Sequence, residues 1–204
     1  MSEWVPLSAD EVAERLADWL TSASGIVRVA VDGAPVAAPD AFAAGLIDRM
    51  QVRGRPVAHV TAASFWRDAS LRLEHGREDI ESYLSWLDAA ALRREVLDAV
   101  TASGNYLPSL RDPETNRSTR EAPLPAEPDL VLLVSGSLLL RHGLPFDRTI
   151  HLSVSRAARA RRTPPEDSWT LPAYDEYDAA VRPVDTADVV VKLDDVRHPA
   201  LRWT

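Results

Sequence analysis

The sequence predicts an α/β fold in which five parallel strands form one sheet with helices on both faces. Two observations predict it: five short apolar runs rich in β-branched residues, and segments between them whose apolar residues recur at helical spacing. Because these runs do not alternate strictly between apolar and polar residues, they indicate strands that are buried on both sides. The expected strands cover residues 26–31, 57–62, 130–134, 149–154 and 188–193.

An amphipathic helix is the first element. Ser8 to Glu11 has the capping-box pattern, in which two side chains three positions apart satisfy the first N–H groups of a helix. Apolar residues then recur at helical spacing, at Val12, Leu16, Trp19 and Leu20. The helix should therefore run to about Ser22, and Gly25 ends the connection to the first strand.

A strand, a helix and a second strand follow. The strand at 26–31 leads through a loop into a segment with helical spacing at Phe42, Leu46, Ile47 and Met50. Gly54, Arg55 and Pro56 then separate this helix from the strand at 57–62. We expect a βαβ unit with parallel strands and a right-handed crossover.

The second half of the chain supplies two more helices and three strands. The helices are expected within residues 78–100, after which Gly104 closes the region. Residues 105–128 are rich in Pro, Arg, Asp and Glu and have no clear period, which predicts a loop or short exposed hairpin. A linker is the weaker interpretation, because the strands on either side need each other to complete one sheet.

Composition narrows the classes of function. The 204 residues include 31 acidic and 23 basic ones, giving a net charge of −8, which disfavours nonspecific attraction to nucleic acid or anionic lipid. The absence of cysteine excludes thiolate metal sites and cysteine nucleophiles. No apolar run approaches the length of a membrane span, and no signal peptide is visible. We expect a cytoplasmic, single-domain protein that binds neither nucleic acid nor membrane.

The stretch from Ile26 to Asp40 has the layout of a strand that feeds a phosphate-binding loop. Such a loop has the pattern G-x-x-x-x-G-K-S/T, in which backbone N–H groups cradle phosphate oxygens, the lysine meets the outer phosphates and the hydroxyl ligates Mg²⁺. Gly33 opens the loop here, but Ala38, Pro39 and Asp40 occupy its last three positions. The side chains that would grip a phosphate are missing.

Pro39 and Asp40 work against a bound polyphosphate. Pro39 supplies neither an ammonium group nor a backbone donor, and Asp40 adds a negative charge beside a helix N-terminus. One unit charge at ~4 Å, with an effective dielectric of about 20, is worth roughly 4 kcal/mol, so triphosphate binding should weaken by several powers of ten. The same two residues also suit an ordinary helix start after an unrelated turn, where the helix dipole favours an acidic side chain.

Five segments follow one another in a specific order along the chain. They are the turn at 31–33, Ser64-Phe65-Trp66-Arg67, the helices at 78–100, the segment at 132–136 and the closing stretch from Arg156 to Asp195. In this order they resemble the uridine kinase-like branch of P-loop nucleoside and nucleotide kinases. The resemblance implies one three-layer P-loop kinase-like domain over residues 1–204, with strand order 2-3-1-4-5 and a lid-like region at 155–180.

The resemblance also implies a chemical role for four positions at which this chain departs from the family. The family's general base corresponds to Ala63, which cannot accept a proton, and general-base help contributes about 10²–10⁴-fold. A family carboxylate near the metal corresponds to Ser135. With Pro39 and Asp40, the departures fall on four parts of phosphoryl transfer. The resemblance therefore implies a pseudokinase without catalytic residues.

An aromatic cleft is the first candidate for residual binding. Rings in the substrate half of such a cleft could stack on a nucleoside base, and arginines could fix its polar groups. Aromatic residues at helical spacing also build ordinary cores, so this alternative stays open. The candidate residues are Trp66, Arg67, Tyr83, Trp86, Arg117 and Ser135.

An arginine cluster is the second candidate. Arg156, Arg159 and Arg162, together with Arg161, match a lid helix that covers ATP phosphates in the family. They could bind a smaller anion such as a monophosphate, or they could form one face of a solvated helix. The five histidines show no paired metal spacing, so we expect no metal site and no cofactor.

Two other functions remain open. The first is an active nucleoside kinase that uses ATP and Mg²⁺ with a non-standard phosphate site, in which Arg159 or Arg162 replaces the lysine. The second is a homodimeric or partner-binding scaffold. It is suggested by the proline-rich segment at 105–128 and by three tryptophans, Trp4, Trp19 and Trp203.

Overall fold

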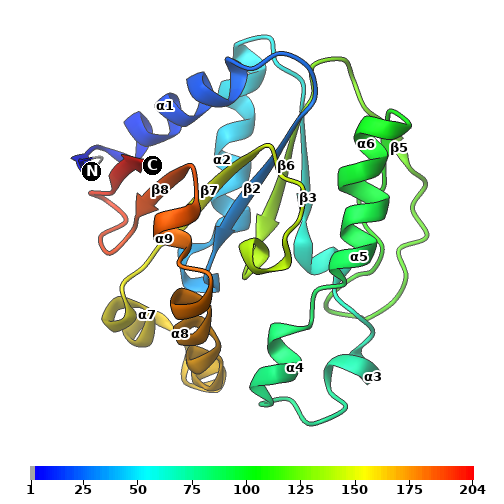
Figure 1. The fold of residues 1–204 in the computed structure, drawn as a ribbon, viewed down its shortest axis with the longest axis vertical. Helices are drawn as coiled ribbons and strands as arrows, with labels where there is room; N and C mark the ends of the chain where they lie inside the picture. Colours follow the sequence, from blue (N-terminus) through cyan, green and yellow to red (C-terminus); the bar gives the residue numbers. More distant parts are fainter. Residues whose placement is uncertain (1–2) are drawn as a thin grey trace.

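The computed structural model describes residues 3–204, and its centre is a seven-stranded sheet with the order β1-β9-β8-β7-β2-β6-β3 (Figure 1). The strands are β1 Val5–Pro6, β2 Val27–Gly33, β3 Val57–Thr61, β6 Val131–Gly136, β7 Arg148–Ser153, β8 Val189–Lys192 and β9 Ala200–Trp203. Five of them, β3, β6, β2, β7 and β8, are the expected strands. They pair in parallel and in the expected order.

The sheet is mixed, so the prediction of a five-stranded parallel sheet is wrong in this respect. β9 pairs antiparallel with β8, and β1 pairs antiparallel with β9. Both strands extend one edge of the sheet, where the N-terminal and C-terminal segments lie together (Figure 1). β1 has 2 residues and β9 has 4, which is too short for either to show a strand period in the sequence.

Helices cover both faces of the sheet, which confirms the three-layer arrangement. The helices of these layers are α1 Ala9–Thr21, α2 Pro39–Val52, α5 Ala89–Leu92 and α6 Ala99–Ala102, with a π-helical stretch at Arg93–Asp98. Val29 and Val31 of β2 belong to the core under α1 and α2. Ala30 belongs to the core under the other helices, because successive side chains of a strand point to opposite faces.

Four of the remaining helices gather beyond the carboxyl ends of the central strands (Figure 1). They are α3 Ala69–Arg72, α4 Ile80–Leu84, α7 Arg156–Arg162 and α8 Leu171–Ala180, whereas α9 Pro183–Thr186 contacts β7. Leu84 of α4 and Tyr174 of α8 meet Ala34 of the loop after β2 in a small apolar cluster. Within residues 3–204, no helix is long and apolar enough to cross a membrane.

Several local signals in the sequence are confirmed. Ser8 caps α1 as part of a complete capping box. α2 begins at Pro39 and has Asp40 in its first turn. The segment 105–128 contains an antiparallel pair, β4 Asn105–Tyr106 with β5 Leu124–Pro125, with residues 107–123 between the two strands.

The three tryptophans that suggested a scaffold make contacts within the chain. Trp19 packs edge-on against Trp203, with their ring centroids 5.1 Å apart. Arg148 lies over the ring of Trp19, and Arg202 lies over the ring of Trp4, at 4.5 and 4.7 Å from the centroids. These rings therefore have intramolecular partners, and the homodimer stays a prediction.

Candidate functional site

The loop between β2 and α2 keeps one backbone feature of a phosphate loop but few of its donors. Ala38 has left-handed backbone angles, φ 50° and ψ 58°, where the motif has its second glycine. The N–H of Ala37 donates to the carbonyl of Ala34, and the N–H of Ala38 donates to that of Pro35. Pro35 and Pro39 have no N–H group. Four residues of this loop therefore present no backbone donor to an anion.

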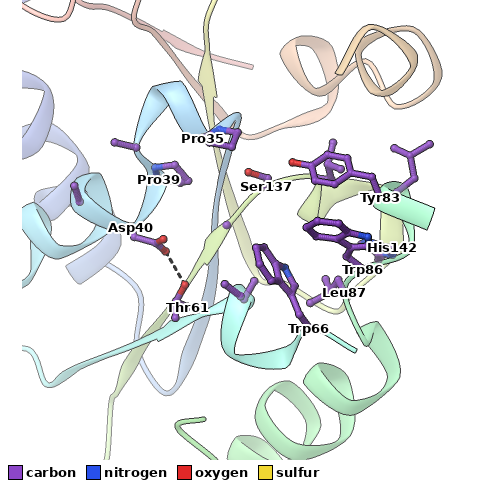
Figure 2. A pocket seen from close by; sticks show the side chains of 17 residues that line it. Pro35, Pro39, Asp40, Thr61, Trp66, Tyr83, Trp86, Leu87, Ser137 and His142 are labelled. Atoms are coloured by element: carbon purple, nitrogen blue, oxygen red, sulfur yellow. Dashed lines mark hydrogen bonds between the residues drawn. The ribbon is translucent and has the colours of Figure 1, made fainter. Parts of the chain in front are cut away.

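Asp40 is held by polar side chains from two neighbouring strands. Its Oδ1 atom accepts hydrogen bonds from the hydroxyl groups of Ser135 and Thr61, the latter at 2.9 Å (Figure 2). His59 Nε2 lies 2.7 Å from the Oγ atom of Ser135. Within residues 3–204, no group donates to the second carboxylate oxygen, Oδ2. Asp40 therefore keeps one oxygen for a ligand.

Asp40 and Ser135 contact each other in the opposite arrangement to the one that the resemblance implies. By that resemblance, a hydroxyl is expected at position 40 and a carboxylate at position 135. Here the carboxylate is at 40 and the hydroxyl at 135, and the two side chains contact each other. Along the sequence they are two separate departures from the expected pattern. In three dimensions they are one carboxylate–hydroxyl pair in the reverse order to the expected one.

His59 completes this pair as a hydrogen-bond donor. Burial lowers the pKa of His59, and the negative charge of Asp40 opposes that effect only in part, so the imidazole is neutral at pH 7. Because Ser135 gives its single proton to Asp40, the Nε2–H of His59 donates to Ser135. A serine bonded in this way is not activated as a nucleophile. The hydrogen bonds among His59, Ser135 and Asp40 therefore connect β3 and β6 to the start of α2.

A cavity of about 400 Å³ lies beside the loop at the carboxyl ends of β2, β3 and β6 (Figure 2). Its labelled lining residues are Pro35, Pro39, Asp40, Thr61, Trp66, Tyr83, Trp86, Leu87, Ser137 and His142. Among the described lining residues, Asp40 is the single carboxylate, and none is Lys or Arg. Ala63 also lines the cavity, so the position that the resemblance assigns to the base presents only a methyl group.

His142 is a polar lining residue that no motif in the sequence marks as part of a site. It ends a short 3₁₀ turn after β6, at Leu139–His142. Burial, helped by the positive charges of Arg141 and Arg67, lowers the pKa of His142 to about 4. Its ring is therefore neutral at pH 7 and can contribute a hydrogen bond but no charge.

Trp66, Tyr83 and Trp86 form an aromatic wall of the cavity. The ring centroids of Trp66 and Trp86 are 5.3 Å apart, and those of Tyr83 and Trp86 are 4.9 Å apart. Both pairs are edge-to-face, which is a favourable geometry for aromatic rings. Arg72 stacks on Trp66 and Trp86 but does not line the cavity, so it supports the two rings from outside.

The structure brings together part of the predicted cleft. The three aromatic residues line the cavity, and Ser135 is fully buried next to Asp40. Arg67 and Arg117 are exposed, and neither lines the cavity. The two arginines therefore differ from the expectation that they contribute to the cleft.

The arginines of the lid-like region are committed to contacts within the chain. Arg159 is buried and pairs with Asp175 and Asp178, at 3.0 and 2.9 Å. Arg156 pairs with Asp175 at 2.8 Å. Arg162 donates to the backbone carbonyls of residues 193 and 194. None of the three lines the cavity beside the loop.

A buried carboxylate at the other end of the loop was missed by sequence reasoning. Asp32 is 0% exposed, and its oxygens accept hydrogen bonds from Leu139 N–H at 2.8 Å, His151 Nδ1 at 2.7 Å and the Tyr177 hydroxyl at 2.8 Å. Burial and the charge of Asp32 raise the pKa of Tyr177, so this hydroxyl stays protonated. Asp32 and His151 are register partners of β2 and β7. The sequence signal for this contact was a polar residue, Asp32 or His151, within each of two otherwise apolar strands.

No protein-family model matches the sequence, and no curated protein matches it. Among solved structures, a "possible uridine kinase" from Bacillus stearothermophilus matches with a TM-score of 0.74 and 18% identity, over 89% of this chain and 97% of that one. A "putative fructose transport system kinase" from Silicibacter sp. TM1040 matches with a TM-score of 0.60 and 17% identity, over 89% and 95%. The YGR205w protein matches with a TM-score of 0.58 and 8% identity, over 96% of each chain. The chain therefore has the fold of the uridine kinase-like P-loop kinases.

Proposed function

We propose that this protein is a pseudokinase that binds a small ring-containing molecule beside its loop and does not transfer phosphoryl groups from ATP. The observation that carries the proposal is the charge of the cavity. Its described lining has one carboxylate, Asp40, and no cationic side chain. Phosphoryl transfer depends on positive groups that hold and stabilise the phosphates, and the lining supplies none.

The loop itself supports the loss of phosphate binding. Two of its N–H groups are used by the loop's own carbonyls, and prolines remove two more. Asp40 would repel a phosphate by roughly 4 kcal/mol at about 4 Å and an effective dielectric of about 20. Ala63 provides no proton acceptor. The loop therefore offers few backbone N–H donors, its one charged side chain is negative, and position 63 offers no base.

The cavity supports retained binding of a small molecule. Its volume of about 400 Å³ lies within the usual range of ligand sites, and its walls are mostly apolar with a few polar groups. Trp66 and Trp86 offer rigid aromatic surfaces held by Arg72. A nucleoside or a ring of similar size fits this description, and one structural neighbour is described as a uridine kinase.

The test combines turnover and binding in the full chain. Incubation with ATP, Mg²⁺ and a panel of nucleosides should give no phosphorylated product. ATP with Mg²⁺ should leave the melting temperature unchanged, whereas ligand at about 100 times its Kd would add roughly 2.7 kcal/mol of stability. Asp48→Asn, at another exposed carboxylate of α2, is the matched control for Asp40→Asn. ATP-dependent product formation by the unaltered protein would overturn the proposal, and its loss in Asp40→Asn but not in Asp48→Asn would assign that reaction to this site.

An active, metal-dependent nucleoside kinase is the second candidate, and the pair of Asp40 and Ser135 favours it. Asp40, Ser135 and Thr61 form an oxygen-only donor set, which is the kind that Mg²⁺ prefers. Within residues 3–204, however, no three His, Asp or Glu side chains group as a metal site. Arg159 and Arg162, which would replace the phosphate lysine, are engaged by carboxylates and backbone carbonyls, and neither lines the cavity at Asp40. Magnesium-dependent product formation in the assay above would select this candidate.

A further inference from the structure

The cavity beside the loop has an uneven distribution of charge and aromatic surface. In Figure 2, Asp40 and Thr61 lie on one side, whereas Tyr83, Trp86 and His142 lie on the other. Asp40 takes part in no ion pair within residues 3–204. Its carboxylate is therefore an uncompensated negative charge on the rim of an aromatic cavity.

We propose that this cavity recognises an organic cation: a small molecule that carries a protonated amine next to a planar ring. The amine pairs with Asp40 Oδ2, and the ring packs on Trp66 and Trp86. This inference rests on the proposed function, in that the cavity binds a small molecule, and it names the chemical class of that molecule.

The desolvation of Asp40 decides between a cationic, a neutral and an anionic ligand. A ligand that fills the cavity removes water from the carboxylate, and burying an unpaired charge is unfavourable. A neutral ligand leaves that cost in place, and an anionic ligand adds repulsion. A cationic ligand offsets it with a charge-assisted hydrogen bond.

The carboxylate is already oriented for such a contact. Thr61 and Ser135 both donate to Oδ1, which fixes the plane of the carboxylate and leaves Oδ2 without a protein donor. An ammonium group has three donors and no acceptor, so it complements a free carboxylate oxygen. A ligand hydroxyl could also donate to Oδ2, but without a charge of its own.

The aromatic wall suits the rest of the cation. A cation near the face of an aromatic ring is attracted by the ring's quadrupole, most strongly for tryptophan. Trp66 and Trp86 both line the cavity, whereas Arg72, which stacks on both rings, does not. The neutral ring of His142 and the hydroxyl of Ser137 can hydrogen-bond a polar group farther from the amine.

Three indole compounds that differ in one functional group provide the test. Tryptamine carries an amine, tryptophol a hydroxyl and indole-3-acetate a carboxylate, so ring and size are closely matched. Isothermal titration of the full chain at pH 7 should rank them amine, then alcohol, then acid. The amine should bind at least about tenfold tighter than the alcohol, the size expected for one hydrogen bond to a charged group.

Substitutions test whether Asp40 causes the preference for the amine over the alcohol. Asp40→Asn should reduce the ratio of amine to alcohol affinity to about one, because it removes the charge and keeps the shape. Asp40→Ser should do the same, and it serves as a second variant if the first does not fold. Asp48→Asn, at another exposed carboxylate of α2, should leave the ratio unchanged. Trp86→Leu should weaken all three compounds.

Three results would overturn the inference. They are equal affinity for the amine and the alcohol, an amine preference that survives both substitutions of Asp40, and no binding of any of the three compounds at their solubility limits. Tight binding of a neutral nucleoside without any preference for amines would contradict this inference but would agree with the proposed function. ATP-dependent product formation would sink the proposed function and is measured separately.

Discussion

Asp32 and Asp40 stand at the two ends of the same loop and have opposite surroundings. Asp32 is fully buried and accepts hydrogen bonds from three donors that belong to three different parts of the chain. Asp40 is exposed, accepts two hydroxyl groups on one oxygen and lines a cavity. Both oxygens of Asp32 are hydrogen-bonded within the chain, whereas Asp40 keeps one oxygen available to a ligand.

This difference separates structural from recognition roles within one short segment. A buried carboxylate persists only if its hydrogen bonds are made, so Asp32 contributes to the stability of the native state. An exposed carboxylate with a free oxygen contributes little to stability and can discriminate between ligands. The free energy of unfolding should therefore respond to changes at Asp32, and ligand selectivity to changes at Asp40.

The largest effect is expected from Asp32→Asn. His151 Nδ1 and the Tyr177 hydroxyl donate to Oδ2, and Leu139 N–H donates to Oδ1. In either orientation, the NH2 group of an asparagine would face at least one of these donors instead of accepting from it. The free energy of unfolding should fall by about 3–5 kcal/mol, as for other buried pairs that lose one partner. Urea denaturation at pH 7 measures it.

Asp48→Asn is the control for that measurement, because its side chain is exposed on α2. Its free energy of unfolding should change by no more than about 0.5 kcal/mol. A decrease below about 1 kcal/mol for Asp32→Asn would contradict the structural role of the buried carboxylate.

An intermediate effect is expected from a double-mutant cycle on the pair of Asp40 and Ser135. Ser135→Asp alone places a second carboxylate against Asp40 in a buried position, and Asp40→Ser alone removes the acceptor of two hydroxyl groups. Making both changes restores one carboxylate and one hydroxyl. The double variant should be more stable than the sum of the single effects predicts, by about 0.5–3 kcal/mol. Chemical denaturation of the four proteins gives this coupling energy, and additivity within about 0.5 kcal/mol would show that the two positions act independently.

The smallest effect is expected from His142→Gln and concerns pH. Because the folded-state pKa of His142 is lowered from 6.5 to about 4, the unfolded chain binds more protons than the native one between these values. The stability that the neutral ring contributes is thus complete above pH 6.5 and is lost as the pH falls toward 4. Burial lowers the pKa of His59 as well, so some acid sensitivity will remain.

Thermal unfolding from pH 7 to pH 4 checks this prediction. His142→Gln should lose less stability over that range than the unaltered protein, and His75→Gln, at an exposed histidine, should follow the unaltered protein. Parallel curves for the unaltered protein and His142→Gln would contradict a buried, neutral His142. The effect is small because the ring is only partly buried and solvent screens its charge.

Most of the central fold could be predicted because its signals are local. The run at 130–134 is apolar enough to mark a buried strand, and the capping box at Ser8 marks the start of α1. β1 and β9 could not be predicted in this way. Val5–Pro6 gains its structure only by pairing with a strand almost two hundred residues later, and no short window of sequence contains that information.

The site could be predicted only where one position carries one role. At Pro39 and Ala63, the side chain alone shows which chemical group expected from the resemblance is absent. The contact between Asp40 and Ser135 spans 95 positions and depends on the parallel pairing of β2 with β6. The hydrogen bond between Asp32 and His151 likewise depends on the register of β2 with β7. Contacts between distant strands were therefore the missing information.

The hydrogen bond from Tyr177 to Asp32 ties α8 to the centre of the sheet. The same helix carries Tyr174, whose hydroxyl lies 2.7 Å from that of Tyr83 in the cavity wall. A wall braced in this way is preorganised, because the entropy of ordering it is lost when the chain folds and not when a ligand arrives. Stopped-flow mixing should then show a single phase whose rate rises linearly with ligand concentration, without a slower closing step.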